Sequence, residues 1–336
     1  MLYMPFKALW VTETETGTFE RTIIDRLIDD LPSGELVIRV HYSSLNYKDA
    51  LSATGNKGIT RKYPHTPGID AAGVVEICRN EQFAVGDEVV VTGNDLGMNT
   101  CGGYGQFIRV PASWVVKKPE NLSLKDCMTI GTAGFTAACA LYKMELMKMT
   151  PAMGPIVVTG ATGGVGSMAV SILTKAGYEV IAVSGKSNAM EYLQHLGATR
   201  VEDRSFVTDF TSKALLKPKW AGAIDTVGGD TLVTLLKACQ PEGCVVSTGL
   251  VSSPKLDATV YPFILNGVNL LGIGSAETPM AVRLIVWEKL NTDWNIKDKL
   301  PAIAKEVTLE ELNATYIDSI LQGKIMGRIV VNLNNL

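Results

Sequence analysis

The chain has 336 residues, 46% of them hydrophobic, and its 31 basic and 34 acidic side chains leave a formal charge of −3 at neutral pH. A chain of this length can bury large cores and is expected to form two domains. The near balance of charge, without long blocks of one sign, argues against a protein that binds nucleic acid or an anionic membrane.

The first residues and the cysteines indicate the compartment. Residues 1–7 lack the charged-then-apolar order of a signal peptide, and no run of about eighteen apolar residues is present to cross a membrane. The six cysteines include no Cys-x-x-Cys pair, and the three histidines do not cluster with them. We therefore expect a cytoplasmic protein whose thiols are mostly small buried side chains, without a zinc finger or a disulfide framework.

Up to about residue 124 the chain has the pattern of strands and turns. Apolar residues alternate with polar or smaller neighbours over 36–42, and apolar runs follow glycine-containing turns at 89–91 and 107–110. This pattern predicts a compact β-rich domain.

Residues 157–166 join a strand-like run to a helix through a glycine-rich turn. The spacing Ala161-x-Gly163-x-x-Gly166 matches the dinucleotide-binding template, except that alanine replaces its first glycine. The helix expected to begin near Gly164 offers unpaired N–H groups and a positive dipole end to a pyrophosphate. A second strand-like run follows within about thirty residues, which is the βαβ context that the motif requires. The segment predicts a nucleotide pocket.

The turn after the second strand indicates which cofactor binds. A site that prefers NAD places Asp or Glu about twenty residues beyond the glycines, whereas a 2′-phosphate requires donors and positive charge. Here the strand ends in Ser184-Gly185-Lys186, with a hydroxyl and an ammonium but no carboxylate. Arg204 follows the presumed third strand and adds a guanidinium at the same edge of the sheet. We predict NADPH; the alternative is that Lys186 and Arg204 are solvated surface cations.

Strands and helices continue to alternate to about residue 272, which predicts a doubly wound sheet. The tail is expected to form helices over 279–290 and 309–321 and a strand over 328–331 that rejoins the first domain. Further strand-like runs lie at 223–225, 244–247 and 270–271.

With this order of regions the chain resembles the medium-chain dehydrogenase/reductase superfamily. The resemblance implies an α/β fold with a GroES-like partial β-barrel catalytic domain, residues 1–124 and 273–336, and a doubly wound Rossmann nucleotide-binding domain, residues 125–272. Five motifs are similar to the zinc-independent, quinone oxidoreductase-like branch, which includes bacterial acryloyl-CoA reductases. They are residues 44–49, 67–70, 131–137, the glycine turn and 221–228.

The residues at the zinc positions argue against a metal. Zinc-dependent relatives need a thiolate, an imidazole beside a glutamate, and a further ligand. In this chain Asn46 stands where the first cysteine is expected, and Gly68-Ile69-Asp70 stands where Gly-His-Glu is expected. The four-cysteine structural zinc lobe is absent as well. We predict a site without metal.

A site without a Lewis acid favours conjugate reduction. Hydride addition to a double bond already polarised by a carbonyl or thioester needs mainly positioning and a stabilised enolate oxygen. We therefore predict NADPH-dependent reduction of an activated C=C bond in a small molecule, with acryloyl-CoA or a similar short enoyl thioester as first choice. Two alternatives stay open: an NADPH:quinone oxidoreductase, and a non-catalytic NADPH-binding redox sensor.

The loop at 46–49 contains the candidate catalytic residues. Tyr47 is the candidate proton donor, because phenols, with a reference pKa of about 10, are protonated at neutral pH. Asn46 is a candidate to hold the thioester carbonyl or the nicotinamide ribose, and Asp49 to order the loop. The alternative for all three is a structural role, for Tyr47 in a loop that covers the cofactor.

The resemblance also implies further cofactor contacts and an assembly. Relatives suggest a homodimer, with no nucleic-acid or membrane partner. The implied cofactor-binding residues, besides those of the turn after the second strand, are Tyr47, Thr136, Thr162, Gly163, Gly164, Val165, Leu250, Ile264, Ser275 and Arg328.

Overall fold

The computed structural model describes residues 5–334, and contacts divide the chain into two units. Unit 1 comprises the described residues up to Thr132, Ala276–Asn291, and those from Ile303 onward, whereas unit 2 comprises Ala133–Ser275 and Thr292–Ala302. The first boundary lies inside helix α2 (Leu124–Leu146), later than the limit near residue 124 expected from the change of pattern.

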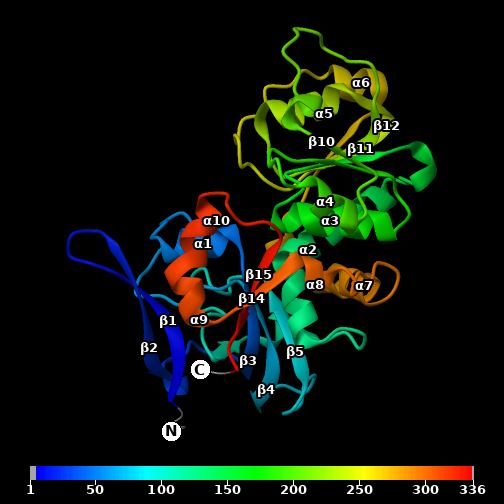
Figure 1. Ribbon diagram of the computed structural model, residues 1–336. Coiled ribbons are helices and arrows are strands. Elements are labelled where there is room, and N and C mark those ends of the chain that lie inside the picture. The colour runs from blue at the N-terminus through cyan, green and yellow to red at the C-terminus, as the bar shows by residue number, and fades with distance from the viewer. Residues whose placement is uncertain (1–4, 335–336) are drawn as a thin grey trace. The chain divides into compact units, whose positions relative to one another are not determined.

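Unit 2 contains a parallel sheet in the order β10-β9-β8-β11-β12-β13. Figure 1 shows α3 and α4 on one face of this sheet and α5 and α6 on the other, which explains why β8, β9 and β11 are buried along their whole length. The doubly wound sheet is as predicted. Its elements are β8 (Ile156–Thr159), α3 (Gly164–Lys175), β9 (Val180–Val183), α4 (Met190–Leu196), β10 (Arg200–Glu202), β11 (Trp220–Asp225), α5 (Gly229–Lys237), β12 (Cys239–Ser247), α6 (Tyr261–Asn266) and β13 (Asn269–Gly272).

Unit 1 is built mainly from antiparallel strands. Within the described residues a seven-stranded sheet has the order β14-β15-β3-β4-β5-β7, with β6 beside β3, and β1 and β2 pair separately. Alternate residues of β3 enter different cores: Leu36 and Ile38 enter one, and Val37 packs with Phe6 and Phe107. The elements are β1 (Pro5–Glu13), β2 (Phe19–Leu27), β3 (Leu36–Leu45), α1 (Tyr47–Ala53), β4 (Asp70–Cys78), β5 (Glu88–Thr92), β6 (Phe107–Val110), β7 (Val115–Lys117), β14 (Ala304–Val307) and β15 (Arg328–Asn332).

The tail returns to the first sheet, as predicted. β15 runs antiparallel to β3, with Ile329 opposite Leu45, and this register brings Arg328 next to the residues that follow β3. The remaining helices are α7 (Met280–Asn291), α8 (Leu300–Ile303), α9 (Leu309–Glu311) and α10 (Ile317–Leu321), with a π-helical turn between the last two. Within residues 5–334, every helix is too short or too polar to span a bilayer.

Candidate active site and nucleotide-binding turn

The glycine turn lies between β8 and α3 and is packed too closely for side chains. Gly160 has a φ of 57°, and the amide of Ala161 donates to the carbonyl of Val183 at the end of β9 (3.1 Å). A Cβ on Gly166 would lie 2.3 Å from the carbonyl oxygen of Gly160. The last template glycine therefore lets α3 begin directly against the turn, which leaves the N–H groups at its first residues available to a phosphate.

A buried carboxylate ties this turn to the neighbouring strand. Asp225, at the end of β11, is fully buried and accepts hydrogen bonds from the Thr159 hydroxyl (2.6 Å) and the Gly228 amide (2.8 Å). Burial raises its pKa above the ordinary value. Thr226 in turn donates through its hydroxyl to the Thr159 carbonyl (3.0 Å). The sequence analysis assigned no role to Asp225. Its position at the end of a predicted strand, within the motif 221–228, could have indicated a structural or binding role.

The predicted 2′-phosphate residues lie together at one end of the unit 2 sheet. The Ser184 hydroxyl accepts from the amide of Lys186 (3.1 Å) and lies 3.4 Å from the Thr162 hydroxyl, across from the glycine turn. β10 pairs in parallel with β9, Glu202 opposite Val183, so Arg204 follows the end of the adjacent strand. Partial burial lowers the pKa of Lys186.

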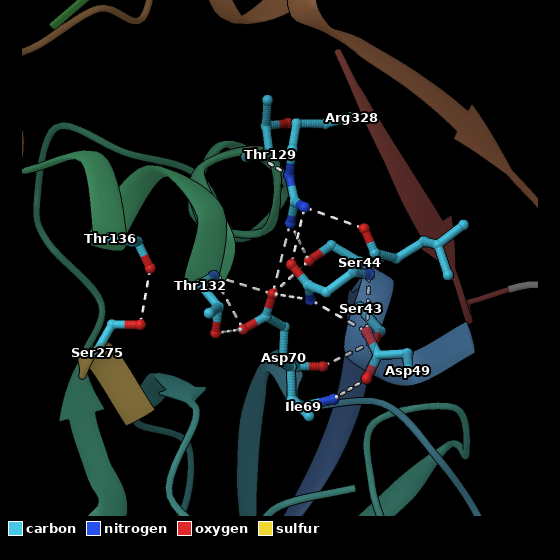
Figure 2. A network of polar contacts seen from close by, with 12 residues as sticks. Ser43, Ser44, Asp49, Ile69, Asp70, Thr129, Thr132, Thr136, Ser275 and Arg328 are labelled. Atoms are coloured by element: carbon cyan, nitrogen blue, oxygen red, sulfur yellow. Dashed lines mark hydrogen bonds and ion pairs between the residues drawn. The ribbon is translucent and has the colours of Figure 1, made fainter. Parts of the chain in front are cut away.

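The other predicted contacts of unit 2 differ in exposure. Thr136 donates through its hydroxyl to the Ser275 hydroxyl (2.7 Å, Figure 2), so these two side chains are held together. Leu250 and Ile264 are exposed apolar residues, at 63% and 68%. Gly163 caps α3, and Gly164 and Val165 are its first two residues.

In unit 1, the predicted catalytic loop is the start of helix α1. Asn46 precedes the helix, and its amide donates to the carboxylate of Asp49 (2.8 Å), as in a capping box. The other oxygen of Asp49 accepts from the amide of Ile69 (2.8 Å). Tyr47 is the first residue of the helix and is 53% exposed, whereas Asp49 is fully buried. The phenol of Tyr47 is therefore exposed at a helix start that the hydrogen bonds of Asp49 hold in place.

A second buried carboxylate, Asp70, joins this loop to two other segments (Figure 2). Its Oδ2 accepts from the Ser44 hydroxyl (2.7 Å) and from the Asn46 side-chain amide (2.8 Å). Its Oδ1 accepts from the hydroxyl (2.6 Å) and the amide (3.0 Å) of Thr132, in helix α2. Asp70 thus holds the end of β3 and a turn of α2 against the start of β4.

Arg328 completes the network from the first position of β15. It is 2% exposed and donates to the Ser44 hydroxyl (2.7 Å) and the Asn46 side-chain oxygen (2.9 Å), and its Nη2 lies 3.5 Å from Asp70 Oδ2. Burial lowers the pKa of Arg328, and the charge of Asp70 opposes that shift. It also donates to two backbone carbonyls, so in unit 1 the partners of its guanidinium are a carboxylate, a hydroxyl, a side-chain amide oxygen and two carbonyls. Its predicted role as a cofactor contact stays a prediction.

The network fixes the side chain of Asn46 and requires a glycine at 131. The nitrogen of the Asn46 amide donates to Asp49 and Asp70, and its oxygen accepts from Arg328. Gly131 interrupts α2 with a φ of 49°, and a Cβ there would lie 2.5–2.8 Å from atoms of Arg328, Asp70 and Ser44. Sequence reasoning missed this close approach and the roles of Ser44 and Thr132, because the partners are far apart in the chain.

The positions that hold zinc ligands in zinc-dependent relatives are part of this packed network or its surroundings. Asn46 and Asp70 are saturated with hydrogen bonds, and Ile69 is a buried aliphatic side chain. Among residues 5–334, no group of three or more His, Cys, Asp and Glu side chains could hold a metal ion. An amide and an aliphatic chain do not supply the donors that zinc prefers.

Asp49 makes the stability of unit 1 depend on pH. Burial, and next the charge of Asp70, raise its pKa from 3.8 to about 7. The folded state therefore binds the proton more tightly, so this contribution to stability is complete below about pH 4 and is lost as the pH rises through about 7. We expect Asp49→Asn to flatten the pH dependence of the free energy of unfolding over this window, measured by urea unfolding. The exposed control Asp29→Asn should leave the slope unchanged; a slope retained in Asp49→Asn would contradict the assignment.

Comparison with known proteins identifies the class. The family model described as Alcohol dehydrogenase GroES-like domain matches residues 32–120, and that described as Zinc-binding dehydrogenase matches 164–288. The chain thus has the two domains of an alcohol dehydrogenase-type oxidoreductase. It belongs to the medium-chain dehydrogenase/reductase superfamily, in the quinone oxidoreductase-like branch, which confirms the resemblance and the predicted fold class.

Similar proteins cover nearly the whole chain. The putative quinone oxidoreductase YhfP of Bacillus subtilis is 47% identical over 305 residues, covering 91% of this chain and 92% of that protein. Acrylyl-CoA reductase AcuI of Ruegeria pomeroyi is 43% identical over 330 residues, covering 98% and 99%. Two crystal structures superpose closely: the yhdH oxidoreductase of Salmonella enterica with NADP (TM-score 0.94, 40% identity, 98% and 100% covered) and B. subtilis yhfP with NAD (0.95, 44%, 98% and 100%).

Proposed function

We propose that this protein is an NADPH-dependent reductase of an activated C=C bond, with acryloyl-CoA or a similar short enoyl thioester as substrate. The observation that carries the proposal is the identity of 43% to an acrylyl-CoA reductase over 98% of this chain. Asn46 and Asp70, which stand at zinc-ligand positions, are instead hydrogen-bonded to each other, and Asn46 accepts from Arg328. This supports the proposal, because reduction of a polarised alkene does not need a Lewis acid.

The chemistry divides between cofactor and protein. NADPH, when bound, supplies the hydride that adds to Cβ of the thioester. The protein must then hold the enolate oxygen and deliver a proton to Cα, so that one hydride and one proton saturate the double bond. Tyr47 is the proposed proton donor, because its phenol stands on a loop whose base is fixed by Asn46 and Asp49.

The proposed cofactor is NADPH rather than NADH. The turn after β9, residues 184–186, has the Ser184 hydroxyl and the Lys186 ammonium and no carboxylate, and Arg204 adds a guanidinium after the adjacent strand β10. These groups suit a 2′-phosphate dianion. Of the two similar structures described above, one carries NADP and the other NAD, so the choice of NADPH is argued from the residues of this chain.

A side-by-side assay tests the reaction. Turnover of acryloyl-CoA, crotonyl-CoA and a naphthoquinone is measured with NADPH and with NADH. We expect the highest kcat/KM with acryloyl-CoA and NADPH. A clear preference for the quinone would favour the second candidate, a quinone oxidoreductase, which the identity of 47% to YhfP supports. Tight NADPH binding without oxidation by any of these electrophiles would instead indicate a redox sensor.

Replacing the phenol tests the proton donor. We expect Tyr47→Phe to lower kcat for acryloyl-CoA by about 100-fold, within the range for loss of a general acid. Tyr261→Phe is a matched control, because Tyr261 also begins a helix and is half-exposed, at 46%. Its kcat should stay within about twofold of the wild type. Unchanged turnover in Tyr47→Phe would remove this residue from the mechanism.

We further propose a cytoplasmic homodimer. β13 is an edge strand of the unit 2 sheet, and the exposed apolar residues Ile264 and Leu265 precede it. An edge of this kind suits pairing with a second copy. Sedimentation should give twice the mass of one chain, and Leu265→Lys should lower it; a monomeric wild type would contradict the proposal. The six cysteines are free, which suits a reducing compartment.

A further inference from the structure

Helix α1, which carries Tyr47 as its first residue, is too short to keep its direction by itself. It has seven residues, and helices of fewer than about twelve residues are marginal unless other parts of the protein hold them. At its start the helix is held by the carboxylate of Asp49, which accepts from the amides of Asn46 and Ile69 (2.8 Å each). The direction of the helix, and with it the place of the Tyr47 side chain, therefore depends on what holds its other end.

Tyr63 holds that other end. Its hydroxyl donates to the carbonyl of Ser52 (2.6 Å), in the last turn of α1. Partial burial raises the pKa of Tyr63 above its ordinary value, so the hydroxyl keeps its proton at neutral pH. The side chain of Ser52 is held as well, by a hydrogen bond of 2.7 Å with the hydroxyl of Thr60, and both residues are fully buried. The loop after α1 thus contacts one residue of the helix through both its backbone and its side chain.

The β1–β2 pair anchors Tyr63. The ring of Phe19, in β2, meets the Tyr63 ring edge-on, with 4.7 Å between ring centroids. The ammonium of Lys57 lies 4.9 Å from the centroid of the same ring. Two residues further on, the backbone of His65 exchanges both hydrogen bonds with that of Val11 in β1 (2.8 and 2.9 Å). Tyr63 therefore connects the end of α1 to strands of the same unit.

We propose that Tyr63 positions the proton donor: its hydroxyl holds the last turn of α1 in place, and thereby fixes where the Tyr47 phenol lies. Tyr63 is a positioning residue, since it acts on the reaction only through α1 and Tyr47. Displacing a catalytic group is costly, because a shift of about 1 Å can lower the rate about 100-fold. The inference rests on the proposed role of Tyr47 as proton donor, and not on the choice of cofactor.

Removing the hydroxyl while keeping the ring tests the proposal. Tyr63→Phe keeps the ring contacts and loses only the hydrogen bond to Ser52. We expect kcat for acryloyl-CoA to fall about tenfold, as for a displacement smaller than 1 Å, with the KM of NADPH within about twofold of the wild type. In a Tyr47→Phe background the same change should have no further effect on kcat, because the donor that Tyr63 positions is gone.

Tyr178→Phe is a matched control in unit 2. The hydroxyl of Tyr178 also donates to a backbone carbonyl, that of Met149 (3.0 Å), just beyond the end of α2, and the side chain is buried. Tyr63→Phe and Tyr178→Phe should lose similar stability in urea unfolding, whereas kcat should fall only in Tyr63→Phe. The proposal would be overturned by equal kcat losses in the two variants, by an unchanged kcat in Tyr63→Phe, or by an equal loss with and without the Tyr47 phenol.

The outcomes keep this inference apart from the proposed function. If Tyr47→Phe lowers kcat and Tyr63→Phe does not, the proton donor stands and the positioning role is wrong. If Tyr47→Phe leaves kcat unchanged, the proposed donor fails and this inference fails with it. The proposed reaction is tested separately, by the wild-type substrate panel.

Discussion

Replacing Arg328 with methionine is expected to lower the free energy of unfolding by about 3–5 kcal/mol. The guanidinium is 2% exposed and is hydrogen-bonded to Ser44 and Asn46 with Asp70 alongside. Methionine fills much of the same volume but leaves the fully buried Asp70 without its cation. Chemical denaturation of the purified protein measures the change.

Two further variants test whether the loss of stability in Arg328→Met comes from the buried ion pair. Arg21 pairs with Asp318 at the surface, where the side chains are 19% and 49% exposed, and Arg21→Met should cost less than about 1 kcal/mol. Adding Asp70→Asn to Arg328→Met should recover part of the loss, because it removes the unpaired charge. Equal losses for Arg328→Met and Arg21→Met would contradict the buried network.

Reversing the charge of Lys186 is expected to raise the KM of NADPH about 100-fold and to change that of NADH little. Lys186→Glu removes an attraction to the 2′-phosphate and adds a repulsion, and each change of about 1.4 kcal/mol is tenfold in affinity. It also places a carboxylate where sites that prefer NAD have one. Burial lowers the pKa of Lys186, which reflects reduced solvation of its ammonium and hence weaker screening by water.

The comparison of both cofactors is the decisive measurement. Steady-state KM values for NADPH and NADH are determined at saturating thioester. Lys213→Glu makes the same charge reversal on an exposed lysine of unit 2 and should alter neither value by more than about twofold. Equal effects of Lys186→Glu on the KM of NADPH and that of NADH would contradict the proposal that the 2′-phosphate binds at this turn.

Local patterns predicted the elements of the nucleotide-binding unit closely. The glycine motif places the start of a helix near Gly164, and α3 begins there. The strand predicted at 179–183 is β9, and the tail strand at 328–331 is β15. The spacing of apolar residues and the glycines at the ends of elements depend on a few neighbouring residues, so helices and strands can be predicted from them without knowledge of the fold. The helix predicted over 309–321 is instead three successive segments, with a π-helical turn over 312–316.

The candidate active site could be predicted only in part. The loop Asn46-Tyr47-Asp49 was found from its resemblance to a family motif, and the structure places it at the start of α1. The buried partners of Asn46 could not be read from the sequence, because Asp70 and Arg328 are 24 and 282 positions away. Their meeting depends on the register of β15 on β3 and on the close approach of Gly131.

The sequence by itself determined the class of this protein and the place of the glycine turn between β8 and α3, and it predicted which residues would bind a 2′-phosphate. These depend on short motifs, in which neighbouring residues act together. Only the tertiary structure decided which polar groups neutralise one another and which stay available. Arg328 and Arg204 are both single arginines that follow no local motif, yet one is buried beside Asp70 and the other lies exposed on Gly185. Burial and strand pairing make that difference, because they set the partners of a charge from distant parts of the chain.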